Sequence, residues 1–162
     1  MNKIAEIKRA ILRIVDKLRE QKYISDLAKD AAEIIRKRTR LGFGVGSDGA
    51  PRHKLPALKP SYVRQRERFR RLSGNTRPGK SNLTRTGQLL DSLRGRYKSK
   101  GKGEVYVQSN RDDGKTNDEI AFHVSGKRPF AHLSNSEINQ LKNKVRKDLK
   151  AEVNKILQRI KR

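Results

Sequence analysis

The chain contains no cysteine, which excludes disulfide frameworks and thiolate metal sites. Aromatic residues make up 5% of its 162 residues and hydrophobic residues 33%, so we expect a thin core supported by partner subunits. No stretch approaches the ~20 apolar residues of a membrane-spanning helix. The N-terminus mixes acids and bases and lacks the unbroken apolar stretch of a signal peptide. We therefore expect a cytosolic protein where it is made, with no membrane partner.

Acidic residues are scarce. The chain has 41 Lys and Arg against 17 Asp and Glu, which gives a net charge of +24. Residues 41–102 hold 16 bases and 3 acids, so the middle of the chain is its most electropositive part. Such a charge attracts anions, which leaves nucleic acid, an acidic protein surface and anionic lipid as candidate partners.

An amphipathic region lies at each end of the chain. Apolar residues recur every three or four positions over residues 3–38, which predicts helix. The polar tract at 20–22 leaves one long helix or two open, with Ser25 or Asp26 as the candidate cap of a second helix. At the other end, Ser134 and Glu137 form a capping-box pattern before a similar repeat. This pattern predicts a long helix over 134–162.

The region 41–82 is rich in glycine and proline and has no clear period, which predicts an extended basic arm that orders on assembly. Within it, a short helix is expected to start at Pro60. The run RQRERFRR then offers cations for phosphates or for an acidic partner, against the alternative of a solvated helix face. The predicted contact residues are Arg64, Arg66, Arg68, Arg70 and Arg71.

Residues 83–133 predict a short helix and a β-hairpin. Thr86 is a good N-cap for a helix from Gly87 to about Leu93. EVYVQS and EIAFHVS alternate like strands and flank the turn-rich SNRDDGKTND, which predicts a hairpin between them. An earlier strand is expected near Tyr97. The chain is thus predicted to be one α+β domain, in which long N-terminal (1–40) and C-terminal helices pack on a small antiparallel sheet.

The sequence contains no residue pattern typical of a catalytic, cofactor-binding or metal-binding site. His53, His123 and His132 have no second histidine or carboxylate at metal-ligand spacing. GFGVGSDG follows a helix and leads into proline, whereas a phosphate-binding loop follows a strand and opens a helix. We therefore predict no catalytic residue, no cofactor-binding residue and no metal ligand, and expect the protein not to be an enzyme.

The order of these pieces resembles a known family. GSDGAPRHKLPALKPSYVRQR, KSNLTRTGQLLDSL, a predicted β-hairpin, GKRPFAHLS and a long helix follow one another as in the tailed-bacteriophage virion morphogenesis family of tail-completion or neck proteins. The resemblance spans about residues 42–160. It departs in a shorter stretch between His123 and Arg128, where members often have a longer glycine-rich loop. The matching positions are Pro56, Leu58, Leu83, Thr86, Gly87, Leu90, Arg128, Pro129 and Phe130.

The resemblance implies a structural virion protein that forms a ring around the DNA channel and completes the tail or joins it to the head. Its implied partners are identical copies in a sixfold or twelvefold ring, the portal or adaptor and tail proteins, and packaged double-stranded DNA. Its implied place is the virion neck, and the host cytoplasm during assembly. In this reading Leu89, Leu90 and Leu93 pack onto the sheet, and Phe130 plugs the start of the last helix. The alternative is a non-specific basic nucleic-acid-binding protein.

Overall fold

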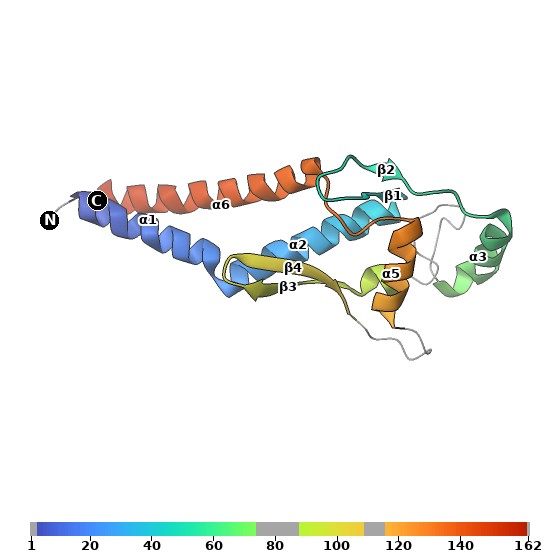
Figure 1. Cartoon of the computed structure of the whole chain (residues 1–162). Coiled ribbons are helices and arrows are strands. Elements are labelled where there is room, and N and C mark those ends of the chain that lie inside the picture. Colours follow the sequence, from blue (N-terminus) through green and yellow to red (C-terminus); the bar gives the residue numbers. More distant parts are fainter. Residues whose placement is uncertain (1–2, 74–87, 109–115, 162) are drawn as a thin grey trace.

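The computed structural model describes residues 3–73, 88–108 and 116–161, and it confirms the α+β class. The molecule is elongated, with both termini at one end and α3 at the opposite end (Figure 1). The elements, in chain order, are α1 (Lys3–Arg19), α2 (Gln21–Arg40), β1 (Phe43–Gly44), β2 (His53–Lys54), α3 (Pro60–Ser73), α4 (Gln88–Asp91), β3 (Leu93–Ser99), β4 (Lys102–Val107), α5 (Asn117–Lys127) and α6 (Asn135–Lys161).

The N-terminal region forms two helices, which resolves the alternative that the sequence left open. The break is one residue long: Glu20 is extended, with a ψ of 140°, and its carbonyl accepts the Ile24 N–H at 3.1 Å. Ser25 and Asp26 lie inside α2, so the prediction that one of them caps the second helix is wrong. Glu20 provides no side-chain cap.

The predicted hairpin is also wrong in its second strand. β4 pairs antiparallel with β3, the strand expected near Tyr97, and residues 117–127 form the helix α5. A second capping box starts this helix: Glu119 N–H donates to Thr116 Oγ1 at 3.4 Å, and the Glu119 carboxylate accepts the Thr116 N–H at 2.9 Å. Phe122, which a strand would have buried, is 79% exposed.

The β3–β4 hairpin packs closely on α2. A Cβ at Gly95 would lie 2.1 Å from the carbonyl carbon of Ala28, and one at Gly103 would lie 3.0 Å from the Ala28 Cβ. Glycines therefore let the strands approach the helix backbone. Gly101, with a φ of 73°, occupies the turn between the strands, where a positive φ favours glycine.

Residues 41–73, which the structure describes, do not show the extended basic loop predicted over 41–82, and residues 74–82 lie outside the described residues. β1 and β2 pair antiparallel, and Val45 and Leu55 beside them are 0% and 6% exposed. Gly49 also pairs with the start of α6, because its N–H donates to the Leu133 carbonyl at 2.8 Å. These apolar anchors fold the first part of the predicted arm onto the domain. The helix predicted to begin at Pro60 is present as α3.

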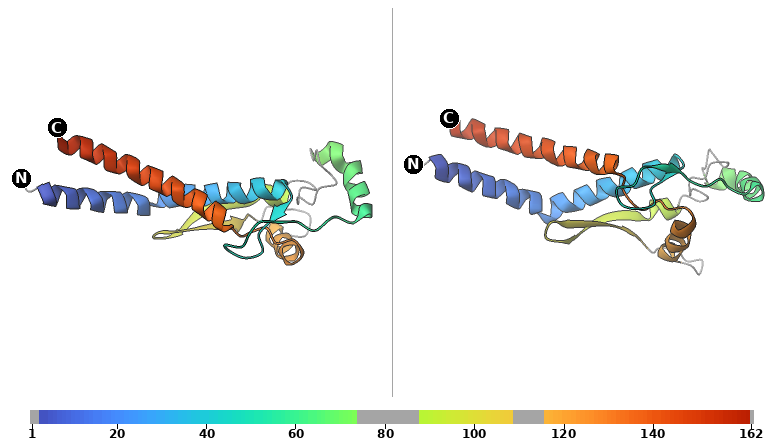
Figure 2. Two further views of the ribbon diagram at one scale, coloured as in Figure 1. Left: turned by 90° about the horizontal axis from the view of Figure 1, so that it is seen from above. Right: turned by 45° about the horizontal axis from the view of Figure 1, so that its top comes forward.

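The C-terminal helix and its capping box are confirmed. Ser134 N–H donates to Glu137 Oε2 at 2.9 Å, and Glu137 N–H donates to Ser134 Oγ at 3.4 Å. α6 lies against α1 and α2 and runs back to the end of the molecule that holds the N-terminus (Figure 2). Of the two terminal helical regions, the N-terminal one covers the β3–β4 hairpin, and it does so through α2.

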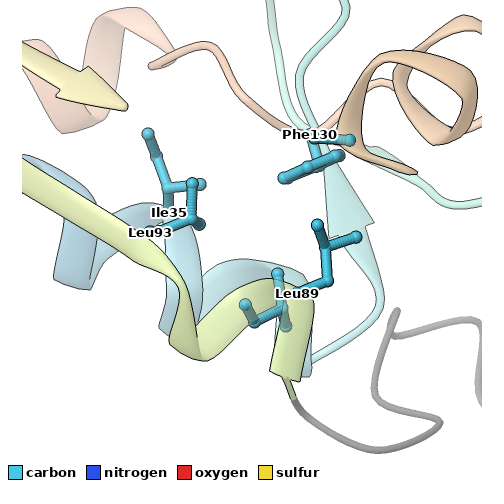
Figure 3. Packing of buried hydrophobic residues seen from close by; sticks show 6 residues of the cluster. Ile35, Leu89, Leu93 and Phe130 are labelled. Carbon is cyan, nitrogen blue, oxygen red and sulfur yellow. The ribbon is translucent and has the colours of Figure 1, made fainter. Parts of the chain in front are cut away.

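The core lies between α2, α4, α5 and the loop before α6. Figure 3 shows Ile35, Leu89, Leu93 and Phe130 gathered there. Leu90 is 0% exposed and Phe130 1%, which confirms the expected burial of the leucines and of the phenylalanine, although Leu93 lies in β3 and so does not pack onto the sheet from the helix. The predicted helix 87–93 is shorter, since α4 ends at Asp91 and β3 begins at Leu93. Its predicted cap Thr86, with Leu83 and Gly87, lies outside the described residues.

Candidate interaction surfaces

The arginines of the RQRERFRR run lie in α3, which places them on different sides of the helix. Arg64 and Arg68 are exposed and lie one turn apart on the same face. Arg66 is 3% exposed, and its burial lowers the pKa of its guanidinium. Arg66 is therefore not on the surface, because positions 64 and 66 point to different sides of a helix, and the predicted anion contacts that α3 exposes are Arg64 and Arg68. The side chains of Arg70 and Arg71 lie outside the described residues.

The family-like RPF element is a packing element. Arg128 ends α5 and donates its backbone N–H to the Val124 carbonyl at 2.7 Å. Pro129 lies against the β1 backbone, where a Cβ on Gly44 would be 2.0 Å from the Pro129 carbonyl oxygen. Phe130 fills the core. These contacts fix the loop that leads into α6.

A buried ion pair, which the sequence analysis missed, anchors this loop. Arg38 is 3% exposed and Glu137 0%, and Arg38 Nη1 lies 2.7 Å from Glu137 Oε2. Arg38 also donates to the carbonyls of His132, at 2.8 Å, and of Phe130. Arg52 Nη2 lies 3.1 Å from the other carboxylate oxygen of Glu137. One carboxylate thus joins α2, α6 and the segment between β1 and β2.

The sequence did hold a signal for this pair. Arg38 falls three residues after Ile35 and seven after Ala31, on the apolar face of α2. A cation at a buried helix position requires a partner, since burial otherwise disfavours its charge. Desolvation lowers the pKa of Arg38, and the charge of Glu137 and the hydrogen bond to it oppose that shift.

The outer face of the β3–β4 hairpin is basic. Because Gly95 and Gly103 face α2, their neighbours Arg94, Arg96 and Glu104 face away from it. Glu104 binds Arg96 and Lys98 at 2.7 Å and 2.9 Å, and these hydrogen bonds lower the pKa of its carboxyl group. The Arg96 guanidinium lies 4.3 Å from the centre of the Tyr106 ring.

The end formed by the termini carries apolar surface. α1 and α6 meet at an ion pair of Lys17 with Glu152, and α2 and α6 meet at a hydrogen bond from Tyr23 to Asp148, both at 2.9 Å. Several large hydrophobic side chains of the two helices remain exposed by 37–55%. We call these residues the terminal apolar rows: Ile7, Ile11 and Leu12 on α1, and Leu149, Val153 and Leu157 on α6.

Within residues 3–73, 88–108 and 116–161, no group of three or more His, Cys, Asp or Glu side chains is arranged to hold a metal ion. No helix among those residues has the length and hydropathy needed to cross a bilayer. His123 is exposed on α5. Comparisons with protein-family models, curated proteins and solved structures found no match to this chain.

Proposed function

We propose that the chain is a structural subunit of the head–tail connector of a tailed bacteriophage, where identical copies form a ring around the DNA channel. The terminal apolar rows carry the assembly part of this proposal. Six large hydrophobic side chains are exposed on two helices that contact each other, and an accumulation of exposed apolar side chains favours contact with another protein surface. The resemblance of the motif order assigns the assembly to the virion neck.

The TGQLL and RPF motifs support a structural role, in which they maintain the shape of the subunit. The TGQLL and RPF elements supply Leu90 and Phe130 to the core. The residues before Phe130 have structural contacts too, since Arg128 ends α5 and Pro129 lies against the β1 backbone. Residues of this kind position surfaces, as a connector subunit requires. A sixfold or twelvefold ring, portal or adaptor and tail partners, and a place in the virion neck follow from the resemblance and belong to the proposal.

The test is the oligomeric state of the purified chain and of one double variant. Ile11→Ser with Leu157→Ser removes apolar surface from both helices at positions that are 55% and 48% exposed, so the monomer should stay folded. The wild type should form ring-sized particles in native mass spectrometry and electron microscopy, and the variant should not. Phe122→Ser is the matched control, because it removes a 79% exposed side chain outside the rows and should leave the rings intact.

The second candidate function is a monomeric, non-specific nucleic-acid-binding protein, which the net charge of +24 favours. A wild-type chain that stays monomeric with and without DNA, and that is absent from purified virions, would favour this alternative. Ring formation that depends on the terminal apolar rows would favour the connector.

A further inference from the structure

We infer that the outer face of the β3–β4 hairpin binds the phosphate backbone of double-stranded DNA. The hairpin, Leu93–Val107, contains five cations and one acid. This assignment goes beyond the connector proposal, since the face would contact DNA in a ring or as a monomer. The cations are Arg94, Arg96, Lys98, Lys100 and Lys102.

The strand pairing places the charge on one side. Arg94 lies opposite Tyr106 and Arg96 opposite Glu104, and residues paired in this way share a face of the sheet. The contact of Lys98 with Glu104 shows that Lys98 lies on that face too. Three cations at alternate positions of β3 therefore form a row along the strand.

The spacing of the row suits a duplex. Alternate residues of a strand are about 6.6–6.8 Å apart. Phosphates of one DNA strand recur about every 3.4 Å along the helix axis and also turn around it, so the cations would contact neighbouring phosphates along the backbone path. α2 supports the opposite face of the hairpin through the close approach at Gly95, which makes the row a fixed surface.

The chemistry of the face favours phosphate over a protein surface. None of the large hydrophobic side chains that are exposed elsewhere belongs to Leu93–Val107, all of which the structure describes. Protein interfaces contain an apolar centre, as the terminal apolar rows provide and this face does not. The face is also poor in the aromatic platforms on which single strands stack, because Arg96 covers Tyr106. A duplex backbone remains the ligand that fits.

Glu104 competes with DNA for two of the cations. It pairs with Arg96 and Lys98, which remain 58% and 64% exposed. The Tyr106 ring lies against the Arg96 guanidinium and supports it without Glu104. The carboxylate also repels an incoming phosphate. Replacing Glu104 with Gln should therefore tighten binding, whereas replacing the cations should weaken it.

The experiment measures binding of a short mixed-sequence DNA duplex by fluorescence anisotropy over a range of NaCl concentrations. The triple variant R94Q/R96Q/K98Q should lower the salt slope of the binding constant by about 2.7, because each lost phosphate contact changes it by about 0.9. K142Q/K147Q/K150Q on α6 removes the same charge from exposed positions and is the matched control. R64Q/R68Q compares the hairpin with the surface of α3.

An unchanged slope in the hairpin variant, or an equal loss in the α6 control, would overturn the inference. So would weaker binding of E104Q, or a hairpin variant that loses polyglutamate binding and keeps DNA binding, since the partner would then be an acidic protein. Circular dichroism verifies that each variant is folded. Native mass spectrometry of the same samples reports ring formation separately, so failure of the connector proposal and failure of this inference give different results.

Discussion

The end of the molecule around Phe130 and the end formed by the two termini are both largely helical, but their contacts differ. Around Phe130, apolar side chains are buried and an ion pair is enclosed with them. At the termini, α1 and α6 meet through solvent-exposed polar contacts, and the terminal apolar rows remain uncovered. The first end supplies stability and the second supplies surface, so substitutions should separate folding from assembly.

The two regions should differ most in their loss of stability when a charged side chain is introduced. Leu90→Asp should destabilise the fold by at least about 4 kcal/mol, because it removes a fully buried side chain and buries a carboxylate. Leu12→Asp, at a position that is 55% exposed, should change stability by less than about 0.5 kcal/mol. Urea unfolding of both variants checks this. Similar losses would show that the termini belong to the same core.

The two ion pairs provide a second comparison. Glu137→Gln leaves Arg38 buried without its counter-charge and should cost about 3–5 kcal/mol. Glu152→Gln breaks an exposed pair with Lys17 and should have a much smaller effect, because water screens that pair. Thermal and urea unfolding measure both. Equal effects would contradict the assignment of Glu137 as the anchor of α6.

Two glycine-to-alanine substitutions should change stability by smaller amounts and in opposite directions. Gly95→Ala places a Cβ against the Ala28 backbone and should cost about 1–3 kcal/mol as β3 moves away from α2. Gly126 lies in α5 with nothing within 4 Å of an added Cβ, so Gly126→Ala should stabilise the fold by up to about 1 kcal/mol. Chemical unfolding measures both changes, and a stable Gly95→Ala variant would refute the close packing of hairpin and helix.

The smallest effect concerns the contact between α2 and α6. Partial burial and the hydrogen bond to Asp148 raise the pKa of Tyr23 from 10.0 to about 12. The unfolded chain therefore loses this proton first, and the contribution of Tyr23 is complete below pH 10 and lost as the pH rises to about 12. Tyr23→Phe should show a smaller decline in stability over this window. The urea midpoint of unfolding, measured over this pH window for the wild type and for Tyr23→Phe, gives the difference in decline, and Tyr62→Phe is the control.

Elements with a clear local signal could be predicted from the sequence. The 3.6-residue repeat and the Ser134–Glu137 box predicted α6, and the buried leucines followed from the family-like turn. The strand predicted at EIAFHVS was wrong because a short alternation of apolar residues also fits a helix. There Ala121 is buried and Phe122 exposed, and the box of Thr116 and Glu119 starts that helix.

The remaining features depend on contacts between distant parts of the chain. The pairing of Arg38 with Glu137 joins residues 99 positions apart. The close approach of Gly95 to Ala28 requires the hairpin to be placed on α2 first. The charge of the RQRERFRR run predicts Arg66 as a contact for phosphates or an acidic partner, whereas α3 turns that side chain away from the surface. The local pattern indicates that Arg38 needs a partner and that alternate arginines of the run face different sides of a helix, but it does not identify Glu137 or Ala28 as the residues that Arg38 and the hairpin contact.

The carboxylate of Glu137 has a consequence for the dynamics of the long helix. It accepts the Ser134 N–H at the first turn of α6 and pairs with Arg38 and Arg52 from two other segments. The first turn of α6 therefore cannot fray without separating two arginines from their counter-charge. Opening of α6 must begin at its far end, beside the start of α1, so the helix loosens in one direction.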